Sequence, residues 1–145
     1  MEHGTVLHEF TNACIRGLLG KMKRIARDNG ITVDDIRKNC ILRISCEKGY
    51  LSIAKWLVNK FWLTVSDARA ENNYVLRKSC FNGHLTVAQW LVNTFGLTVE
   101  DAIEDDNYAL RESCDNGHLD VAQWLVNTFG LTVDDPRIWN NITVI

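Results

Sequence analysis

The chain has 145 residues, of which 46% are hydrophobic and 23% charged, with a formal net charge of −2. This balance indicates one folded globular domain and excludes an intrinsically disordered chain, because enough apolar surface is available to offset the entropy cost of ordering. No apolar run approaches the ~20 residues that cross a bilayer. The first residues, MEHGTVLHEF, lack the pattern of a secretory signal.

Four related segments follow one another along the chain. They are residues 10–33, 39–65, 73–99 and 107–133. The last two segments are identical at 23 of 27 aligned positions, and the single proline in the chain favours helices. One cysteine marks the same position in every copy: Cys14, Cys46, Cys80 and Cys114. The repetition predicts one structural unit built several times and stacked.

The fourth copy shows the elements of a unit most clearly. The pattern predicts an inner helix over 108–115, with Asn107 as its N-cap. A turn at 116–117 follows, and an outer helix over 119–129 ends at Gly130. The spacing predicts one buried stripe on the outer helix: Leu119, Ala122, Val126 and Phe129.

Each unit continues with a threonine followed three residues later by an aspartate. These pairs are Thr32 and Asp35, Thr64 and Asp67, Thr98 and Asp101, and Thr132 and Asp135. The spacing matches a capping box, so we expect a short third helix or a single helical turn in each unit.

The motif Leu-x-x-Ser-Cys-x-Asn-Gly-His-Leu-x-Val-Ala-x-Trp-Leu-Val resembles the inner helix, Gly-His turn and outer helix of the ankyrin repeat. The resemblance covers nearly the whole chain, and the repeats are similar in style to ankyrin-like proteins of large DNA viruses of amoebae. It departs from the family in its 34-residue period and in the Thr-x-x-Asp signal, which stands where ankyrin repeats form a β-hairpin. We therefore expect an all-α, ankyrin-like solenoid of about four stacked helix-turn-helix repeats, with a short third helical turn in place of the hairpin.

The expected repeats divide a single domain, residues 1–145. Their ranges are 8–38, 39–72, 73–106 and 107–140, with 141–145 as the start of a truncated fifth repeat or a tail. Stacking predicts a row of tryptophans, Trp56, Trp90 and Trp124. Lys21 and Arg24 replace apolar residues of the later copies, which indicates a polar N-terminal cap. Residues 136–145 either fold over the last repeat or leave apolar surface for a partner.

The sequence gives little support to catalysis, metal binding or a cofactor. Cysteines at equivalent repeat positions lie too far apart for disulfides, since packed helices are ~8–10 Å apart. We interpret them as small core residues, which favours a reducing, cytoplasmic location. His84 and His118 have no recurring partner for a catalytic triad, and the resemblance implies a structural role for them in the turn.

Two sets of charged residues allow alternative interpretations. Recurring arginines and aspartates predict a ladder of ion pairs, or else a basic stripe for an acidic partner: Arg43, Arg77 and Arg111 with Asp67, Asp101 and Asp135. A basic cluster between Arg16 and Arg43 fits a solvated cap face better than a nucleic-acid site, because aromatic residues are not interleaved there.

A partner surface is predicted where the two nearly identical repeats differ. The resemblance implies that the ends of the inner helices face a concave groove, and Trp62 is added because it replaces the glycine that ends other outer helices. The candidate residues are Arg16, Glu47, Lys48, Trp62, Lys78, Phe81, Asn82, Glu112, Asp115 and Asn116. Phe81 is the expected anchor, as an exposed aromatic residue.

We therefore expect a non-catalytic module that binds an unidentified protein. We expect no small-molecule substrate and no membrane contact, and the sequence argues against nucleic acid as a ligand. The alternative is a structural protein that joins head to tail. Residues 1–73 hold twelve Lys and Arg against eight Asp and Glu, whereas residues 74–145 hold four against ten. Such a charge difference allows a monomer or a weak head-to-tail oligomer.

Overall fold

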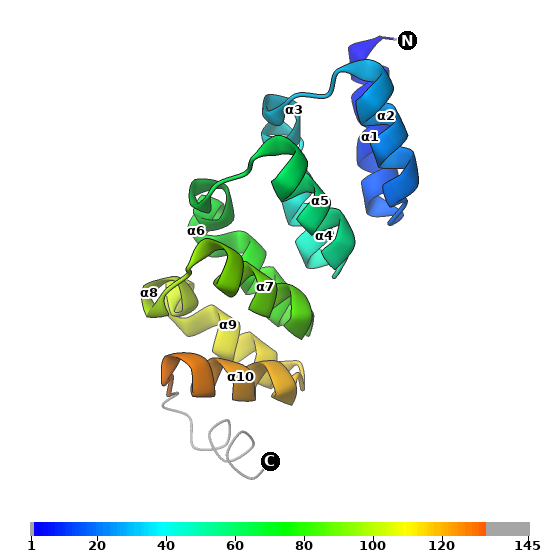
Figure 1. Ribbon diagram of the computed structural model, residues 1–145. Coiled ribbons are helices and arrows are strands. Elements are labelled where there is room, and N and C mark those ends of the chain that lie inside the picture. The colour runs from blue at the N-terminus through cyan, green and yellow to red at the C-terminus, as the bar shows by residue number, and fades with distance from the viewer. Residues whose placement is uncertain (1, 133–145) are drawn as a thin grey trace.

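The structure, a computed structural model, describes residues 2–132, which form ten helices and no strand (Figure 1). In chain order the helices are α1 (His3–Ile15), α2 (Leu19–Asn29), α3 (Val33–Lys38), α4 (Ile41–Glu47), α5 (Leu51–Phe61), α6 (Val65–Phe81), α7 (Leu85–Phe95), α8 (Val99–Ala102), α9 (Glu104–Asp115) and α10 (Leu119–Phe129). The all-α class is confirmed, and short helical segments stand where the resemblance would place hairpins.

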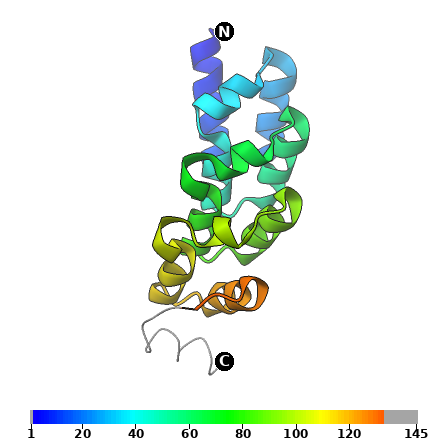
Figure 2. The ribbon, with the colours of Figure 1, turned by 90° about the vertical axis from the view of Figure 1, so that its left-hand side faces the viewer.

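The helices form two layers that extend along the stack. The inner layer contains α1, α4, the second part of α6, and α9, and each of these helices contacts the next. Each packs against one outer helix, in the order α2, α5, α7 and α10. Figure 1 shows α1 and α10 at opposite ends and α3, the start of α6, and α8 along the left-hand side, which faces the viewer in Figure 2. Neighbours in sequence are therefore neighbours in space.

The core repeats with the sequence, because the same positions are buried in successive units. Leu57, Leu91 and Leu125 of the outer helices are fully buried. In α10, however, the buried residues are Val121, Ala122 and Leu125. Of the predicted stripe, Ala122 is buried, Val126 and Phe129 are partly buried against the core, and the fully buried face runs through Val121 and Leu125 instead. Apolar residues cover more than half of this helix, so its pattern fits two faces, and packing against α9 selects one of them.

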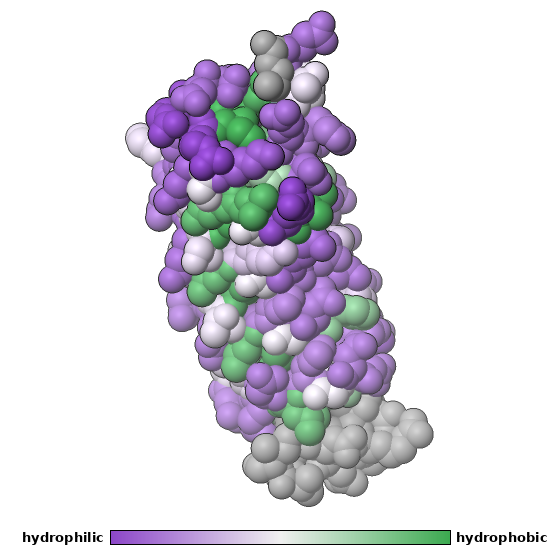
Figure 3. Space-filling view, turned by 90° about the vertical axis from the view of Figure 1, so that its right-hand side faces the viewer, coloured by the Kyte–Doolittle hydropathy of each residue, from purple (hydrophilic) through white to green (hydrophobic). Residues whose placement is uncertain are grey.

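The tryptophans occupy equivalent positions on α5, α7 and α10 and are half-buried. Each packs edge to face against the phenylalanine five residues later, with ring centroids 5.8, 6.1 and 6.2 Å apart. Among residues 2–132 no two tryptophan rings contact each other, and the tryptophan ring that contacts another unit is that of Trp56, which packs against Phe10. Figure 3 shows hydrophobic side chains as separate green areas along the stack.

The turn between inner and outer helix explains the Gly-His motif. Gly83 has a φ of +75°, and a Cβ added to it would lie 2.6 Å from Nδ1 of His118. The His84 ring lies equally close to Gly49, and Tyr50 takes the same place over Gly17. Each glycine therefore leaves room for the ring of the next unit, in addition to adopting a left-handed conformation.

The expected capping boxes are present in three units. The Thr32 amide donates to the Asp35 carboxylate at 2.9 Å, and the Asp35 amide donates to the Thr32 hydroxyl at 3.2 Å. Thr64 pairs with Asp67, and Thr98 with Asp101, in the same way. These reciprocal bonds start α3, α6 and α8. The fourth box includes Asp135, which lies outside the described residues.

The capping aspartates also form the ion-pair ladder, but with other arginines than predicted. The Arg37 guanidinium donates to Asp67 at 2.8 and 3.3 Å, and Arg69 donates to Asp101 at 3.0 and 3.2 Å. At the start of the stack, His3 stands 3.2 Å from Asp35. The pairing predicted from Arg43, Arg77 and Arg111 was wrong, because those residues lie on the inner helices, away from the capping boxes.

Two of those arginines instead stabilise a left-handed turn before the inner helix. Glu71, Asn72 and Asn73 have φ between 54° and 60°, and residues 105–107 repeat this conformation. Arg77 donates to the carbonyl oxygens of Asn72 and Glu71 at 2.8 and 3.1 Å. Arg111 donates to the carbonyls of Asp106 and Asp105 in the same way.

Asn107 is therefore not the side-chain N-cap predicted for this helix. It belongs to the left-handed turn, with φ 61°, and its amide donates to the Thr132 carbonyl at 3.2 Å. Asparagine and aspartate tolerate positive φ better than most residues, which explains why this turn is rich in them. The sequence signal at Asn107 was real, but it marks a turn instead of a cap.

Candidate protein-binding surface

Nine of the ten candidate residues lie together at or near the C-terminal ends of the inner helices. Arg16 follows α1, and Glu47 and Lys48 end α4. The second part of α6 carries Lys78 and Phe81, and Asn82 caps it. Their counterparts on the last inner helix are Glu112, Asp115 and Asn116. Because these helices lie side by side, their ends form one row, which we call the inner-helix row.

The centre of the row is a cluster of rings and cations. The Phe81 ring stacks on Tyr108, with centroids 6.1 Å apart and planes at 19°. The Lys78 Nζ lies 4.6 Å from the Phe81 centroid and donates to the Tyr108 hydroxyl at 3.0 Å. This hydrogen bond raises the pKa of Lys78 above its usual value, so the ammonium group remains charged at neutral pH. Phe81 is thus half-buried between two partners, so the expectation that its ring is exposed was wrong, while its role as an anchor stays a prediction.

A second set of contacts joins this cluster to the preceding helix. The Tyr74 hydroxyl donates to the Glu47 carboxylate at 3.4 Å, and the Asn82 amide donates to the Glu47 main-chain carbonyl at 3.2 Å. Burial and the nearby Glu47 charge raise the pKa of Tyr74, which therefore stays neutral. The end of α4 is in this way fixed to the end of α6, and the row presents a preorganised surface.

Tyr74, Tyr108 and Arg77 belong to this surface but were not among the candidates. The Arg77 guanidinium lies 5.8 Å from the Tyr74 centroid and 5.0 Å from that of Tyr108. A usable signal was present, since a tyrosine stands three residues before an arginine in both the third and the fourth copy. Residues three apart on a helix share a face.

Trp62 lies apart from the other candidates. It caps the C-terminus of α5 with φ 56°, and its side chain is 83% exposed. The inner-helix row adjoins the opposite, N-terminal end of this eleven-residue helix. Glycines occupy the equivalent positions, Gly30, Gly96 and Gly130, all with positive φ. Trp62 thus combines a backbone conformation that favours glycine with a large exposed ring.

The cysteines behave as core residues. All five are free, and Cys14, Cys46 and Cys80 are buried. Burial raises the pKa of each of these three thiols to about 12 and that of Cys114 to about 11, so the reactive thiolate form is suppressed. Within residues 2–132, no three His, Cys, Asp or Glu side chains are grouped as metal ligands. None of the described helices is long and apolar enough to cross a membrane.

The family model for ankyrin repeats, in three copies, matches residues 42–136. The chain belongs to the ankyrin repeat family. Searches of curated proteins and of solved structures returned no match. Ankyrin repeats generally serve as protein–protein interaction modules, and ankyrin repeat proteins are typically not enzymes. This general role agrees with a stack in which His84 and His118 pack over the turn glycines of the preceding units.

Proposed function

We propose that this ankyrin repeat chain is a non-catalytic module that binds a partner protein along the inner-helix row. The observation that carries the proposal is the difference between two nearly identical repeats. Two of their four differences, Lys78 against Glu112 and Phe81 against Asp115, lie on this row. A third pair, Val75 and Ala109, is buried in the core.

The row changes its chemistry along the stack. It is basic at Arg16, mixed at Glu47 and Lys48, and both aromatic and basic at the Phe81 cluster. It then becomes acidic in the last repeat, where Asp115 is exposed. A partner that fits this order would place a basic segment against the last repeat and apolar groups against the centre. Electrostatic complementarity of this kind mainly sets specificity and the rate of association.

The test uses charge reversals at exposed positions that make no described side-chain hydrogen bond or ion pair. Lys48→Glu and Asp115→Lys change the row, whereas Lys55→Glu makes the same change as the first variant on the exposed face of α5. Partners captured from cell lysate by the tagged chain are quantified by mass spectrometry. We expect both row variants to lose the partners that the control retains, with equal melting temperatures. Loss with the control alone would contradict the proposal.

Head-to-tail self-assembly is the second candidate, favoured by the charge difference between the two halves of the chain. The exposed cations of α2, Lys23, Arg24 and Arg27, stand near the N-terminal end of the stack. Such an assembly would weaken as salt screens the charges. Light scattering at 20 and 500 mM salt would show a concentration-dependent rise in mass at low salt only, and a constant monomer mass would exclude this candidate.

A further inference from the structure

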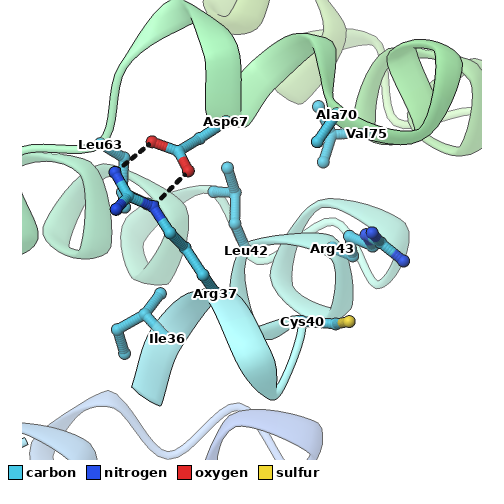
Figure 4. Close-up of a pocket in the computed structure, with 9 residues that line it drawn as sticks. All are labelled: Ile36, Arg37, Cys40, Leu42, Arg43, Leu63, Asp67, Ala70 and Val75. Atoms are coloured by element: carbon cyan, nitrogen blue, oxygen red, sulfur yellow. Dashed lines mark hydrogen bonds and ion pairs between the residues drawn. The ribbon is translucent and has the colours of Figure 1, made fainter. Parts of the chain in front are cut away.

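A pocket of about 210 Å³ lies between the second and third units (Figure 4). Its lining is mostly apolar, with two arginines, an aspartate and a thiol: Ile36, Arg37, Cys40, Leu42, Arg43, Leu63, Asp67, Ala70 and Val75. In Figure 4, Leu42 lies between the Arg37–Asp67 pair and the side chains of Ala70 and Val75. The volume suits one branched aliphatic or aromatic side chain.

The pocket coincides with a shorter connection in the second unit. The interval from Asp35 to Cys46 is two residues shorter than that from Asp67 to Cys80. In the third unit the additional residues form part of the left-handed turn at 71–73. The second unit has a single left-handed residue, Cys40, with φ 56°. The segment that leads into the inner helix is thus two residues shorter in the second unit than in the third.

The shorter connection also leaves an arginine without the main-chain partners that its counterparts have. Arg77 and Arg111 bind the carbonyl oxygens of their own turns, at 2.8 Å for the shorter bond of each. Arg43, at the same position of the second unit, donates no such bond within the described residues, and its guanidinium lies 5.3 Å from the centroid of the Tyr74 ring. Its nearest carboxylate oxygen is Oε1 of Glu71, at 3.5 Å, and that side chain is 67% exposed.

The second arginine of the pocket is already occupied. Arg37 holds Asp67 through two hydrogen bonds, which overcome the effect of burial and lower the pKa of the Asp67 carboxyl. Its charge is therefore matched within the fold. The exposed Lys38 next to it adds a further cation. Arg43, whose charge is shared with the exposed Glu71 carboxylate alone among the described residues, is left as the donor-rich group of the pocket.

From these observations we propose that the pocket binds the C-terminal residue of a partner polypeptide. An apolar side chain fills the space beside Leu42 and Val75, and the terminal carboxylate binds Arg43. A guanidinium matches the two oxygens of a carboxylate, and the equivalent arginines hold two main-chain oxygens each. The inference rests on the proposed function for the source of the ligand. The pocket itself lies at the N-terminal ends of α4 and the second part of α6, whereas the candidates of the inner-helix row lie at their C-terminal ends; Tyr74, over which Arg43 lies, stands between the two.

The first experiment titrates the isotope-labelled full chain with acetyl-Gly-Gly-Gly-Leu, followed by NMR. We expect shifts at the methyl groups of Leu42, Leu63 and Val75 and at Nε of Arg43. The same peptide with a C-terminal amide should bind about tenfold more weakly, because it lacks the charge-assisted hydrogen bonds. Equal affinity for acid and amide, or shifts centred elsewhere, would overturn the proposal. So would equally tight binding of acetyl-leucine, which would indicate a small-carboxylate site.

Variants then separate the guanidinium from general charge. Arg43→Gln should reduce the affinity of the acid to that of the amide, whereas Lys38→Gln, which removes an exposed charge nearby, should change it less than about twofold. Glu71→Gln removes the competing carboxylate and should tighten binding about two- to threefold. A Lys38 variant as weak as the Arg43 variant would refute the assignment.

The same titration distinguishes failure of this inference from failure of the proposed function. Lys48→Glu and Asp115→Lys should leave the binding of the peptide acid unchanged, because these residues lie on the inner-helix row. Weakening by these two variants would place the peptide on the row and refute the pocket. Loss of partner capture with unchanged peptide binding would support both proposals as separate sites.

Discussion

The connection into the second inner helix differs from those into the third and fourth. The latter pass through three left-handed residues, held by an arginine that binds their carbonyls. The connection into the second inner helix passes through one such residue, Cys40, and leaves Arg43 without main-chain partners. The stack tolerates both routes because the capping box before the connection and the packed helix after it remain the same. The difference shows that a change of two residues can create a pocket without disturbing the repeat.

The largest loss of stability is expected from substitutions in the capping boxes that precede these connections. Asp101 is 7% exposed and accepts hydrogen bonds from Thr98, Arg69 and Asn73. Asp101→Ala should therefore lower the free energy of unfolding by about 2–3 kcal/mol. Asp35→Ala, at the start of the stack and beside His3, should cost about 1 kcal/mol. Urea unfolding followed by circular dichroism measures both, and equal losses would show that the ladder adds nothing to the caps.

The arginines test the comparison directly. Arg77→Gln should lower the free energy of unfolding by about 1–2 kcal/mol, because removal of the guanidinium leaves the carbonyls of the left-handed turn without a donor. Arg43→Gln, at the equivalent position of the shorter connection, should change stability by less than about 0.5 kcal/mol. The same urea titrations compare the two variants. A similar loss in both would mean that the two connections are energetically alike.

The acid limb of stability should depend on the capping aspartates. Burial opposes ionisation of Asp101, but its hydrogen bonds from the Thr98 amide and Arg69 outweigh that effect and lower its pKa. The pKa values of Asp67 and Asp35 are also lowered. Carboxyls of this kind stabilise the fold above their unfolded pKa, near 3.8, and the stabilisation is lost as pH falls through the folded value. We expect stability to fall below about pH 4, with a smaller slope in Asp101→Asn.

The smallest effect concerns the left-handed turn itself. Glu71 has φ 54°, a conformation that is costly for residues with a Cβ. Glu71→Gly should therefore stabilise the chain by about 0.5–1 kcal/mol. Cys40→Gly relieves the same conformation in the shorter connection and serves as the matched variant. Thermal unfolding distinguishes the outcomes, and destabilisation by Glu71→Gly would indicate that the turn is not strained.

Several features of the site followed from the sequence. Comparing the two nearly identical repeats singled out Lys78, Phe81, Glu112 and Asp115, and the structure places them on adjacent helix ends. The comparison missed Tyr74, whose hydroxyl donates to Glu47 of the preceding inner helix, and Tyr108, whose ring stacks on Phe81. It also grouped Trp62 with them, although that residue stands at the other end of its helix. Periodicity gives the position along a helix, but the contacts across units depend on how the helices are placed.

The sequence alone determined the repeat, the helix pairs and the capping boxes, because each depends on interactions within a few residues or on a pattern that recurs. The tertiary structure decided which arginine binds each capping aspartate, which face of α10 is buried, and how Asn107 is used. These outcomes depend on groups 25 to 32 residues apart in the chain, such as Asn107 with Thr132 and Arg69 with Asp101. Only the packed stack brings such groups within hydrogen-bonding distance.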